Sequence, residues 1–336
     1  MNARDLVVCT LAFAAAPSAA CAWGAAGHRI IGELAIRALP DEVPQFLRTD
    51  DAVREIGELS REPDRWRGSG PEHDAERDPG HYVDVSDDLS ILGGPKLGAL
   101  PSMRREYDTA LRALGTNQYK AGYLPYSIID GWQQLRTDFA YWRVDVAGGK
   151  FAKSDVARAW FENDRALHEM LAIRDLGIWS HFVGDGSQPM HVSVHYDGWG
   201  DYPNPEGFSN KHGIHLHFEG PFVHDNIGES DVASLVPAPR DCACSIEDRT
   251  AQFLSATEEQ VVPFYRLEKA KAFANPTADG KAFAASRLAV AIAELRDMTV
   301  AAWRESAEAK VGYPPIAVHD AEQGTLDPLP SLRGED

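Results

Sequence analysis

The sequence predicts an all-α protein, a single, mainly helical domain with long functional loops. Apolar residues recur at helical spacing over residues 25–39, 154–186, 247–273 and 279–309. Alternation typical of strands is scarce throughout the chain. Residues 192–213 are rich in Gly, Asn, Asp and Pro and predict a loop between the helical segments.

The helical segments have recognisable boundaries. The first stops at Pro40, the long segment over 154–186 is broken at Gly186 and Pro189, and the last begins near Gly280. Gly93-Gly94-Pro95 predicts a loop before a further helix at about 101–114. Aromatic residues then gather in a stretch that either packs the core of two further helices, which we favour, or lines a site. They are Tyr119, Tyr123, Tyr126, Trp132, Phe139, Tyr141 and Trp142.

The first 22 residues have the pattern of a secretory signal peptide. Arg4 supplies a positive charge, residues 6–16 form an apolar run too short to span a bilayer, and residues 20–22 are a small-x-small cleavage site. Cleavage would make Trp23 the N-terminus of a secreted or periplasmic protein. Its free amine and carbonyl could then chelate a metal ion. In the alternative interpretation, lipoprotein processing at Cys21 would bury that amine in a peptide bond.

Composition indicates the domain organisation of the chain that remains after cleavage and limits the classes of ligand that it could bind. We expect one domain over residues 23–311 and a polar, flexible tail over 312–336, with no transmembrane segment. The formal net charge of −18 argues against a duplex-binding protein, whose affinity comes largely from basic side chains. An acidic protein that handles polyanions needs local positive charge, and metal ions are the obvious source. Cys242 and Cys244 would close a very small ring if oxidised, so a disulfide between them stays open.

Seven of the 12 histidines lie between residues 181 and 224, interleaved with acidic residues. His181 and Asp185 stand four positions apart on a predicted helix, so both face the same side. Pro189 turns the chain and presents His191, and His215 and Glu219 then repeat the four-residue spacing. Imidazole and carboxylate groups in this arrangement predict a helix-built site for several metal ions.

Here the chain resembles the superfamily of secreted tri-zinc nucleases specific for single strands, which are also 3′-nucleotidases, and of zinc-dependent phospholipase C. The resemblance covers most of residues 23–220 with gaps. It lies in four segments: Trp23-Gly24 through His28, Glu62-Pro63-Asp64-Arg65-Trp66-Arg67, His81-Tyr82-Val83-Asp84, and His181 through Asp185 with Gln188-Pro189-Met190-His191.

The resemblance implies the helical fold of that superfamily and three zinc ions. The first ion would be held by Asp64, His81, His181 and Asp185. The second would lie on the Trp23 amine and carbonyl, His28 and the bridging Asp185, and the third on His191, His215 and Glu219. Arg67 would contact the scissile phosphate, while Tyr82 and Asp84 would stack on and hydrogen-bond a base. Asp64, Arg67 and Asp185 are the residues expected to be catalytic.

The implied activity is hydrolysis by metal-activated water of single-stranded DNA or RNA and of 3′-nucleotides, with no stable protein partner. Some residues depart from the nuclease pattern. Ser187 stands where the nucleases carry a histidine, and Glu219 is the phospholipase choice, so a phospholipase C acting on phospholipid head groups is the alternative. A secreted zinc-binding protein without turnover is a third possibility. Compared with that superfamily, the chain carries an insertion between His81 and His181.

Several histidines are ambiguous. His212 or His217 could replace His215 as a ligand, because all three lie in one short run. His195 is either a donor that supports the ligands or a chance placement. His73, His168 and His319 fit none of the ligand spacings, and we expect them to be surface or core residues.

Overall fold

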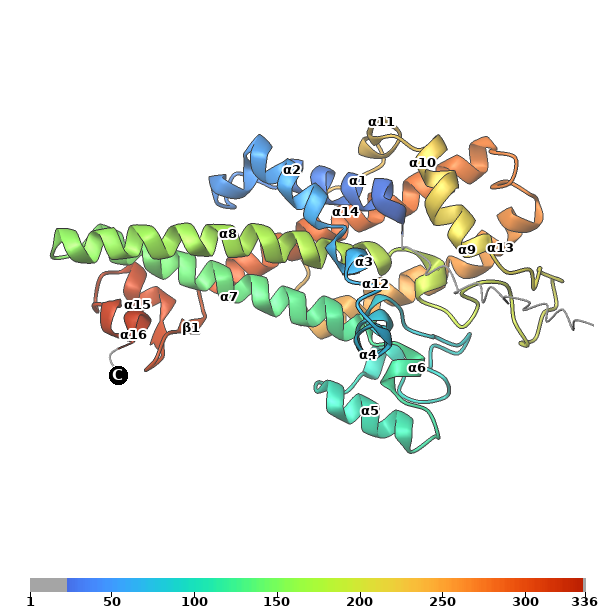
Figure 1. Cartoon of the computed structure of the whole chain (residues 1–336), viewed down its shortest axis with the longest axis horizontal. Coiled ribbons are helices and arrows are strands. Elements are labelled where there is room, and N and C mark those ends of the chain that lie inside the picture. Colours follow the sequence, from blue (N-terminus) through green and yellow to red (C-terminus); the bar gives the residue numbers. More distant parts are fainter. Residues whose placement is uncertain (1–22, 335–336) are drawn as a thin grey trace, which may run out of the picture.

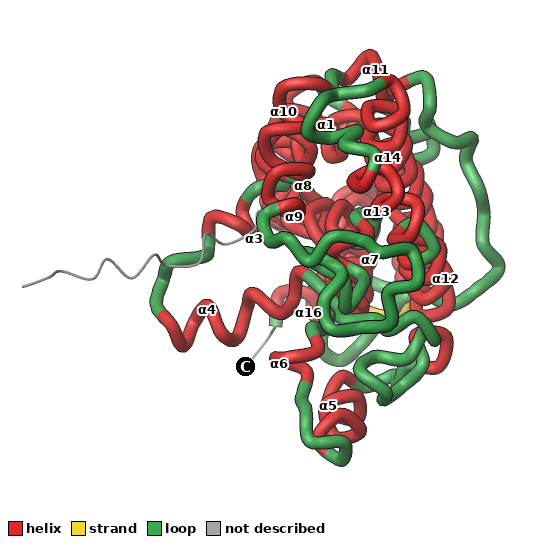
Figure 2. The backbone as a smooth tube through the Cα atoms, turned by 90° about the vertical axis from the view of Figure 1, so that its right-hand side faces the viewer, coloured by secondary structure: helices red, strands yellow, loops and turns green. Residues whose placement is uncertain are grey.

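The computed structural model describes residues 23–334, so the predicted signal peptide and the last two residues lie outside the described chain. The described part is mainly helical, as predicted, with one two-stranded sheet (Figure 2). None of its helices is both long and apolar enough to cross a bilayer. The α-helices are α1 (Gly24–Arg37), α2 (Asp50–Leu59), α3 (Glu62–Arg65), α4 (Pro71–Arg77), α5 (Arg104–Arg112), α6 (Gln118–Ala121), α7 (Leu124–Phe151), α8 (Asp155–Asp185), α9 (Ile214–His217), α10 (Val223–Asn226), α11 (Glu229–Ala233), α12 (Ile246–Glu258), α13 (Val261–Lys269), α14 (Ala278–Ser306), α15 (Val318–Glu322) and α16 (Leu329–Arg333).

The longest helices form the centre of the molecule. Helices α7 and α8 lie side by side as an antiparallel hairpin, α1 and α2 pack along α8, and α14 packs against α7, α8 and α1 (Figure 1). With 31 residues, α8 is about 46 Å long. Its buried residues concentrate in the C-terminal half, which points into the body of the protein. That half therefore offers a rigid, buried frame for polar side chains.

Side-chain caps fix the starts of α8 and α14. The Ser154 hydroxyl accepts the amide of Ala157 at the start of α8, and the Thr277 hydroxyl accepts the amide of Gly280 at the start of α14. The predictions of helices over 25–39, 101–114, 154–186 and 279–309 are confirmed to within a few residues. The segment predicted over 247–273 is divided between α12 and α13, where the chain turns at Glu259 and Gln260.

The aromatic stretch belongs mainly to α7 and packs into the core, the interpretation we favoured. Tyr126, Trp132 and Phe139 are buried, and the Trp132 indole donates to the carbonyl of Met298 on α14. None of the seven aromatic residues lines the cavity beside the histidine groups described below. Their role is therefore to join α7 to α14 and to the α5–α6 region.

The C-terminal segment differs from the flexible tail that we expected. Strands β1 (Lys310–Val311) and β2 (Ile316–Ala317) pair antiparallel, and α15 and α16 follow. Val318 and Ala321 of α15 are buried against Ala140 and Val144 of α7 in a small separate core. The segment is polar on average, but these few apolar side chains cover an apolar strip of α7 that would otherwise face water.

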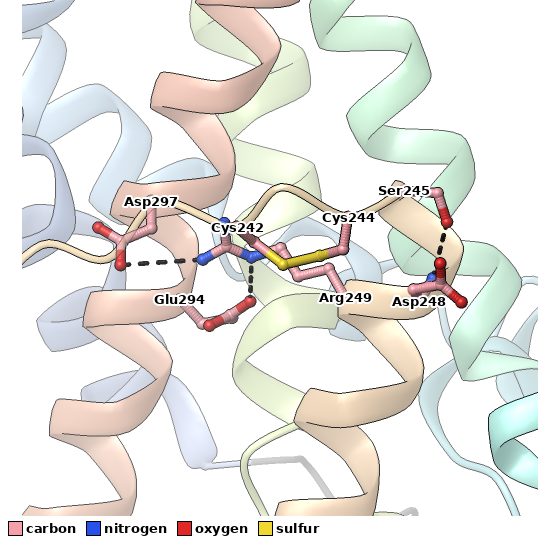
Figure 3. Close-up of a disulfide and its surroundings, with 7 residues drawn as sticks. All are labelled: Cys242, Cys244, Ser245, Asp248, Arg249, Glu294 and Asp297. Atoms are coloured by element: carbon pink, nitrogen blue, oxygen red, sulfur yellow. Dashed lines mark hydrogen bonds and ion pairs between the residues drawn. A yellow bond between two sulfur atoms is a disulfide. The ribbon is translucent and has the colours of Figure 1, made fainter.

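Cys242 and Cys244 are joined in a disulfide on the extended stretch that leads into α12 (Figure 3). Beside the bridge, the buried Arg249 guanidinium of α12 contacts Glu294 at 2.5 Å and Asp297 at 3.8 Å on α14. The amide of Arg240 also donates to Asp297. These contacts hold the stretch on the surface of α14.

Candidate metal centre

Three buried groups of His, Asp and Glu side chains could each hold a metal ion. In each group the potential ligand atoms lie within 4.8 Å of one another. The first group is His28, His181 and Asp185; the second is Asp64, His81 and His181; the third is His191, His215 and Glu219. Every side chain predicted to bind metal through an imidazole or a carboxylate falls in one of these groups.

The first group joins α1 to the end of α8. The His28 ring stacks on the His181 ring with centroids 3.9 Å apart, and Asp185 Oδ1 lies 3.6 Å from His28 Nε2. A glycine makes this approach feasible, because a Cβ at Gly184 would lie 3.1 Å from His28 Nδ1. One turn of α8 carries both His181 and Asp185 on the same face, as the four-residue spacing predicted.

Hydrogen bonds orient the shared histidine. His181 Nδ1 donates to the carbonyl of Ser60 at 2.8 Å, so its Nε2 is left for the interior of the cluster. That Nε2 lies 2.9 Å from His81 Nδ1, 3.4 Å from Asp185 Oδ2 and 3.9 Å from Asp64 Oδ1. His181 is therefore common to the first two groups.

The second group uses short elements of the N-terminal half. Asp64 lies on α3, and His81 ends a short 3₁₀ helix, Asp78–His81. His81 Nδ1 lies 3.1 Å from Asp185 Oδ2. Asp185 thus presents one oxygen to His28 and the other to His81, the geometry needed for a carboxylate that bridges two ions.

The third group adjoins the second through the backbone. His191 Nδ1 donates to the carbonyl of His81 at 2.6 Å, and its Nε2 faces Glu219 Oε2 at 3.4 Å. His215 Nε2 lies 2.8 Å from the same oxygen. Glu219 is part of a π-helical turn, Phe218–Phe222, in which α9 continues into α10. Gln188 donates to Glu219 at 3.1 Å, an orienting contact that the sequence reasoning missed.

The ambiguous histidines are now placed. Among the three in the run, His215 points into the cluster, His212 is exposed, and the His217 ring contacts the carbonyl of Phe273. The His195 ring contacts the carbonyl of Trp199 and Asp87, neither of them a potential ligand. Its placement therefore does not support the role of a donor to the ligands.

The donor atoms fit metal ions. Burying a polar atom without a hydrogen-bond partner is costly, so such atoms are rare in folded proteins. Within residues 23–334, the buried side-chain atoms without a partner include a concentrated set in these three groups. The set is His28 Nδ1 and Nε2, Asp64 Oδ1, Asp185 Oδ1, His191 Nε2, His215 Nε2 and Glu219 Oε1. A bound cation would satisfy atoms of this kind.

The electrostatics also fit cations. Burial lowers the pKa of His28 and His81 well below the usual value and lowers the pKa of His181 to about 3. These imidazoles are therefore neutral at pH 7, the state that binds metal. Burial alone would raise the pKa of Glu219, but His215 and His191 lower it to about 2. Burial also raises the pKa of Asp185 well above the usual value, and the opposing influence of His191 and Arg67 does not offset its desolvation.

Trp23 lies behind this cluster. Its indole nitrogen donates to the carbonyl of Gly184 at 2.9 Å and to the Ser187 hydroxyl at 3.0 Å. The next residue, Gly24, approaches the carbonyl of Glu219 so closely that a Cβ there would lie 3.0 Å away. The start of α1 is thus packed between the first and third groups. Residues 1–22 lie outside the described chain, so a ligand role for the Trp23 amine stays a prediction.

A cavity of about 350 Å³ opens onto the cluster. The potential ligands His81, His191 and His215 form part of its wall. The three predicted substrate contacts, Arg67, Tyr82 and Asp84, also line it, and so do residues that the sequence reasoning missed, namely Asp78, Lys120, Met190 and Tyr196. Burial raises the pKa of Asp84 to about 7. No nearby sequence pattern marks Lys120 or Tyr196, because only the folding of segments far apart in the sequence brings them to the cavity.

No protein-family model, curated protein or solved structure matches this chain. The functional assignment therefore rests on these residues and their geometry.

Proposed function

We propose that this protein is a zinc-dependent phosphodiesterase that hydrolyses single-stranded nucleic acid and 3′-nucleotides. One observation carries the proposal: three adjoining groups of potential metal ligands meet beside a cavity that also contains an arginine, an aromatic ring and a carboxyl group. A site that binds the phosphodiester of a nucleic acid needs this combination of positive charge for the phosphate and a ring surface for a base.

Zinc suits the donor set. Each group combines imidazole nitrogens with one carboxylate, and each leaves coordination positions for water or substrate. Three Zn²⁺ ions against Asp64, Asp185 and Glu219 would give a local charge of about +3 in a strongly acidic protein. When bound, the ions would supply Lewis acidity and lower the pKa of a coordinated water molecule.

The protein's own side chains would orient the substrate. Arg67 is held beside the second group by Asp64 at 3.4 Å and by Asp78 at 3.3 Å, and from there its guanidinium would contact a phosphate oxygen. Tyr82 would stack on a base. Asp84, whose carboxyl group is protonated below about pH 7, would hydrogen-bond the base edge.

The location of the protein belongs to the same proposal. Removal of residues 1–22 would release a secreted or periplasmic enzyme and free the amine of Trp23. The packing of Gly24 against the Glu219 backbone keeps this end of α1 close to the ligands. The freed amine and carbonyl would then complete the coordination of the ion on His28.

A phospholipase C remains the second candidate, because Glu219 and Gln188 match the phospholipase version and are in direct contact. The serine at position 187, where the nucleases carry a histidine, is weaker support for the phospholipase. Its buried hydroxyl contacts the Trp23 indole and the carbonyl of Gly184, and it does not line the cavity. A histidine missing at this position therefore alters the support of α1 rather than the substrate surface.

The test is hydrolysis by the metal-loaded protein of single-stranded DNA, RNA, a 3′-nucleotide and phosphatidylcholine vesicles, each with and without a chelator. We expect chelator-sensitive cleavage of the nucleic acids and the nucleotide. Chelator-sensitive release of phosphocholine alone would replace the nuclease by the phospholipase. No turnover of any substrate, or turnover that the chelator leaves unchanged, would refute both.

A further inference from the structure

A fourth group of potential ligands lies between α7 and α8, away from the cluster described above. It consists of Asp145 on α7 and of Asp164 and His168 on α8. His168 precedes His181 by thirteen positions on one continuous helix, so the two sites are about 20 Å apart. Figure 1 shows α7 and α8 running together toward the end of the molecule where α15 and α16 lie.

The three side chains face one another. His168 Nδ1 lies 2.7 Å from Asp145 Oδ2 and 3.9 Å from Asp164 Oδ2. Asp164 and His168 are four positions apart and share one face of α8. The Tyr141 ring stacks on the His168 ring with centroids 5.0 Å apart, which fixes the plane of the imidazole. The group is therefore held in a defined geometry by elements of both helices.

The surroundings of the Asp145 carboxyl group indicate a missing ligand. It is 1% exposed, and its Oδ1 is buried with no hydrogen-bond partner among residues 23–334. No lysine or arginine in that range forms an ion pair with Asp145 or Asp164. Two carboxylates thus face one imidazole, so even a protonated His168 leaves one negative charge unbalanced, and an unbalanced buried charge is costly. Burial, together with the neighbouring Asp164, raises the pKa of Asp145 to about 6 although His168 opposes this shift.

We propose that Asp145, Asp164 and His168 form a separate site for one divalent transition-metal ion such as Zn²⁺ or Mn²⁺. Two carboxylates balance the charge of the ion, and the imidazole favours a transition metal over Ca²⁺ or Mg²⁺. Asp164 is about a quarter exposed, so the ion has access from solvent and a water molecule can complete its coordination. The ion would bind α7 to α8.

The site also adjoins the C-terminal segment. The ring of Tyr141 stacks on His168, and its hydroxyl accepts a hydrogen bond from the amide of Gly312 at 3.2 Å. An ion between the helices would therefore stabilise the end of the hairpin on which the C-terminal segment packs. The role assigned to it is structural, and it does not depend on the proposed phosphodiesterase activity.

The first test counts bound metal. Protein equilibrated with Zn²⁺ or Mn²⁺ and freed of excess ion is analysed for metal per chain. We expect the double variant Asp164→Asn/His168→Gln to hold about one equivalent less than the wild type. The matched control is His224→Gln/Asp225→Asn, which removes an exposed His–Asp pair and should keep the wild-type content. Equal metal content in the wild type and the Asp164/His168 variant would overturn the proposal.

A second measurement needs no variant, which matters if the double variant does not fold. Anomalous diffraction at the zinc edge from wild-type crystals soaked in Zn²⁺ should give a peak between Asp145 and His168. The absence of a peak there overturns the proposal, whatever density the catalytic cluster shows. Conversely, a peak at this site with none at the cluster would support it and count against the proposed phosphodiesterase.

Discussion

Asp185 Oδ1 lies 3.6 Å from Nε2 of His28, which connects the last turn of α8 to the first turns of α1. Its other oxygen faces His81 at 3.1 Å. One carboxylate therefore reaches two groups of potential ligands at once. We expect Asp185→Asn to lower the zinc content by about two equivalents, since an amide is a poor bridge between cations. Elemental analysis of the dialysed protein measures this. Glu162→Gln, an exposed change on the same helix, is the control, and loss of a single ion would mean that Asp185 does not bridge.

The amine of Trp23 gives a second prediction. Protein that begins at Trp23 should bind its ions more tightly than protein that carries one added alanine before Trp23, because a peptide nitrogen is a much weaker ligand than an amine. Competition with a zinc chelator measures the difference. An alanine added after Asp336 serves as the control. Equal affinity of all three proteins, or a secreted form that begins elsewhere by N-terminal sequencing, would remove Trp23 from the ligands.

The Trp23 side chain can be tested apart from its amine. Trp23→Phe removes the donor to Gly184 and Ser187, and should lower the free energy of unfolding by about 1 kcal/mol for each lost hydrogen bond, plus the lost packing. Urea denaturation of the metal-free protein measures this. Trp160→Phe is the control, because Trp160 is only half-buried. Similar effects of the two changes would contradict a special supporting role for Trp23.

The ring of Tyr82 should decide between substrates. Stacking on a base is worth about 1–3 kcal/mol, so Tyr82→Ala should raise KM for single-stranded DNA about tenfold or more. Tyr82→Phe keeps the ring and loses only a 3.4 Å hydrogen bond to the Tyr119 carbonyl, so its KM should stay close to that of the wild type. If alanine leaves KM unchanged and lowers kcat alone, the ring does not hold a base.

A buried acid on α7 predicts a pH-dependent change in stability. Burial raises the pKa of Asp138 to about 7, and its Oδ2 has no hydrogen-bond partner among the described residues. The folded state therefore retains a proton that the unfolded state releases above about pH 4, so the stability that this proton provides falls as pH rises toward 7. Asp138→Asn cannot ionise, and should be more stable than the wild type by a few kcal/mol at pH 8 and much less so at pH 5.

Thermal unfolding at the two pH values measures the effect of Asp138→Asn. The exposed loop variant Asp201→Asn should show no such difference. A gain for Asp138→Asn that is the same at pH 5 and pH 8 would mean that ionisation of this carboxyl group is not the cause.

Much of the site was predictable because local periodicity determines it. Helical geometry alone places His181 with Asp185 and His215 with Glu219, since residues four apart share a face. The helix boundaries follow from local signals as well, such as the caps Ser154 and Thr277. These relationships depend on neighbours within a few residues, so the sequence by itself determined them.

Only the tertiary structure decided which distant residues meet. In the folded protein the His28 ring stacks on His181, and His215 rather than His212 or His217 lies in the cluster. Folding also brings Lys120 and Tyr196 to the cavity and Asp145 into contact with His168. It also packed the polar C-terminal segment against α7 through Val318 and Ala321. Such contacts arise from the burial of apolar faces and the desolvation of charges. Both depend on how whole helices and loops pack together, so no periodic pattern in the sequence predicts them.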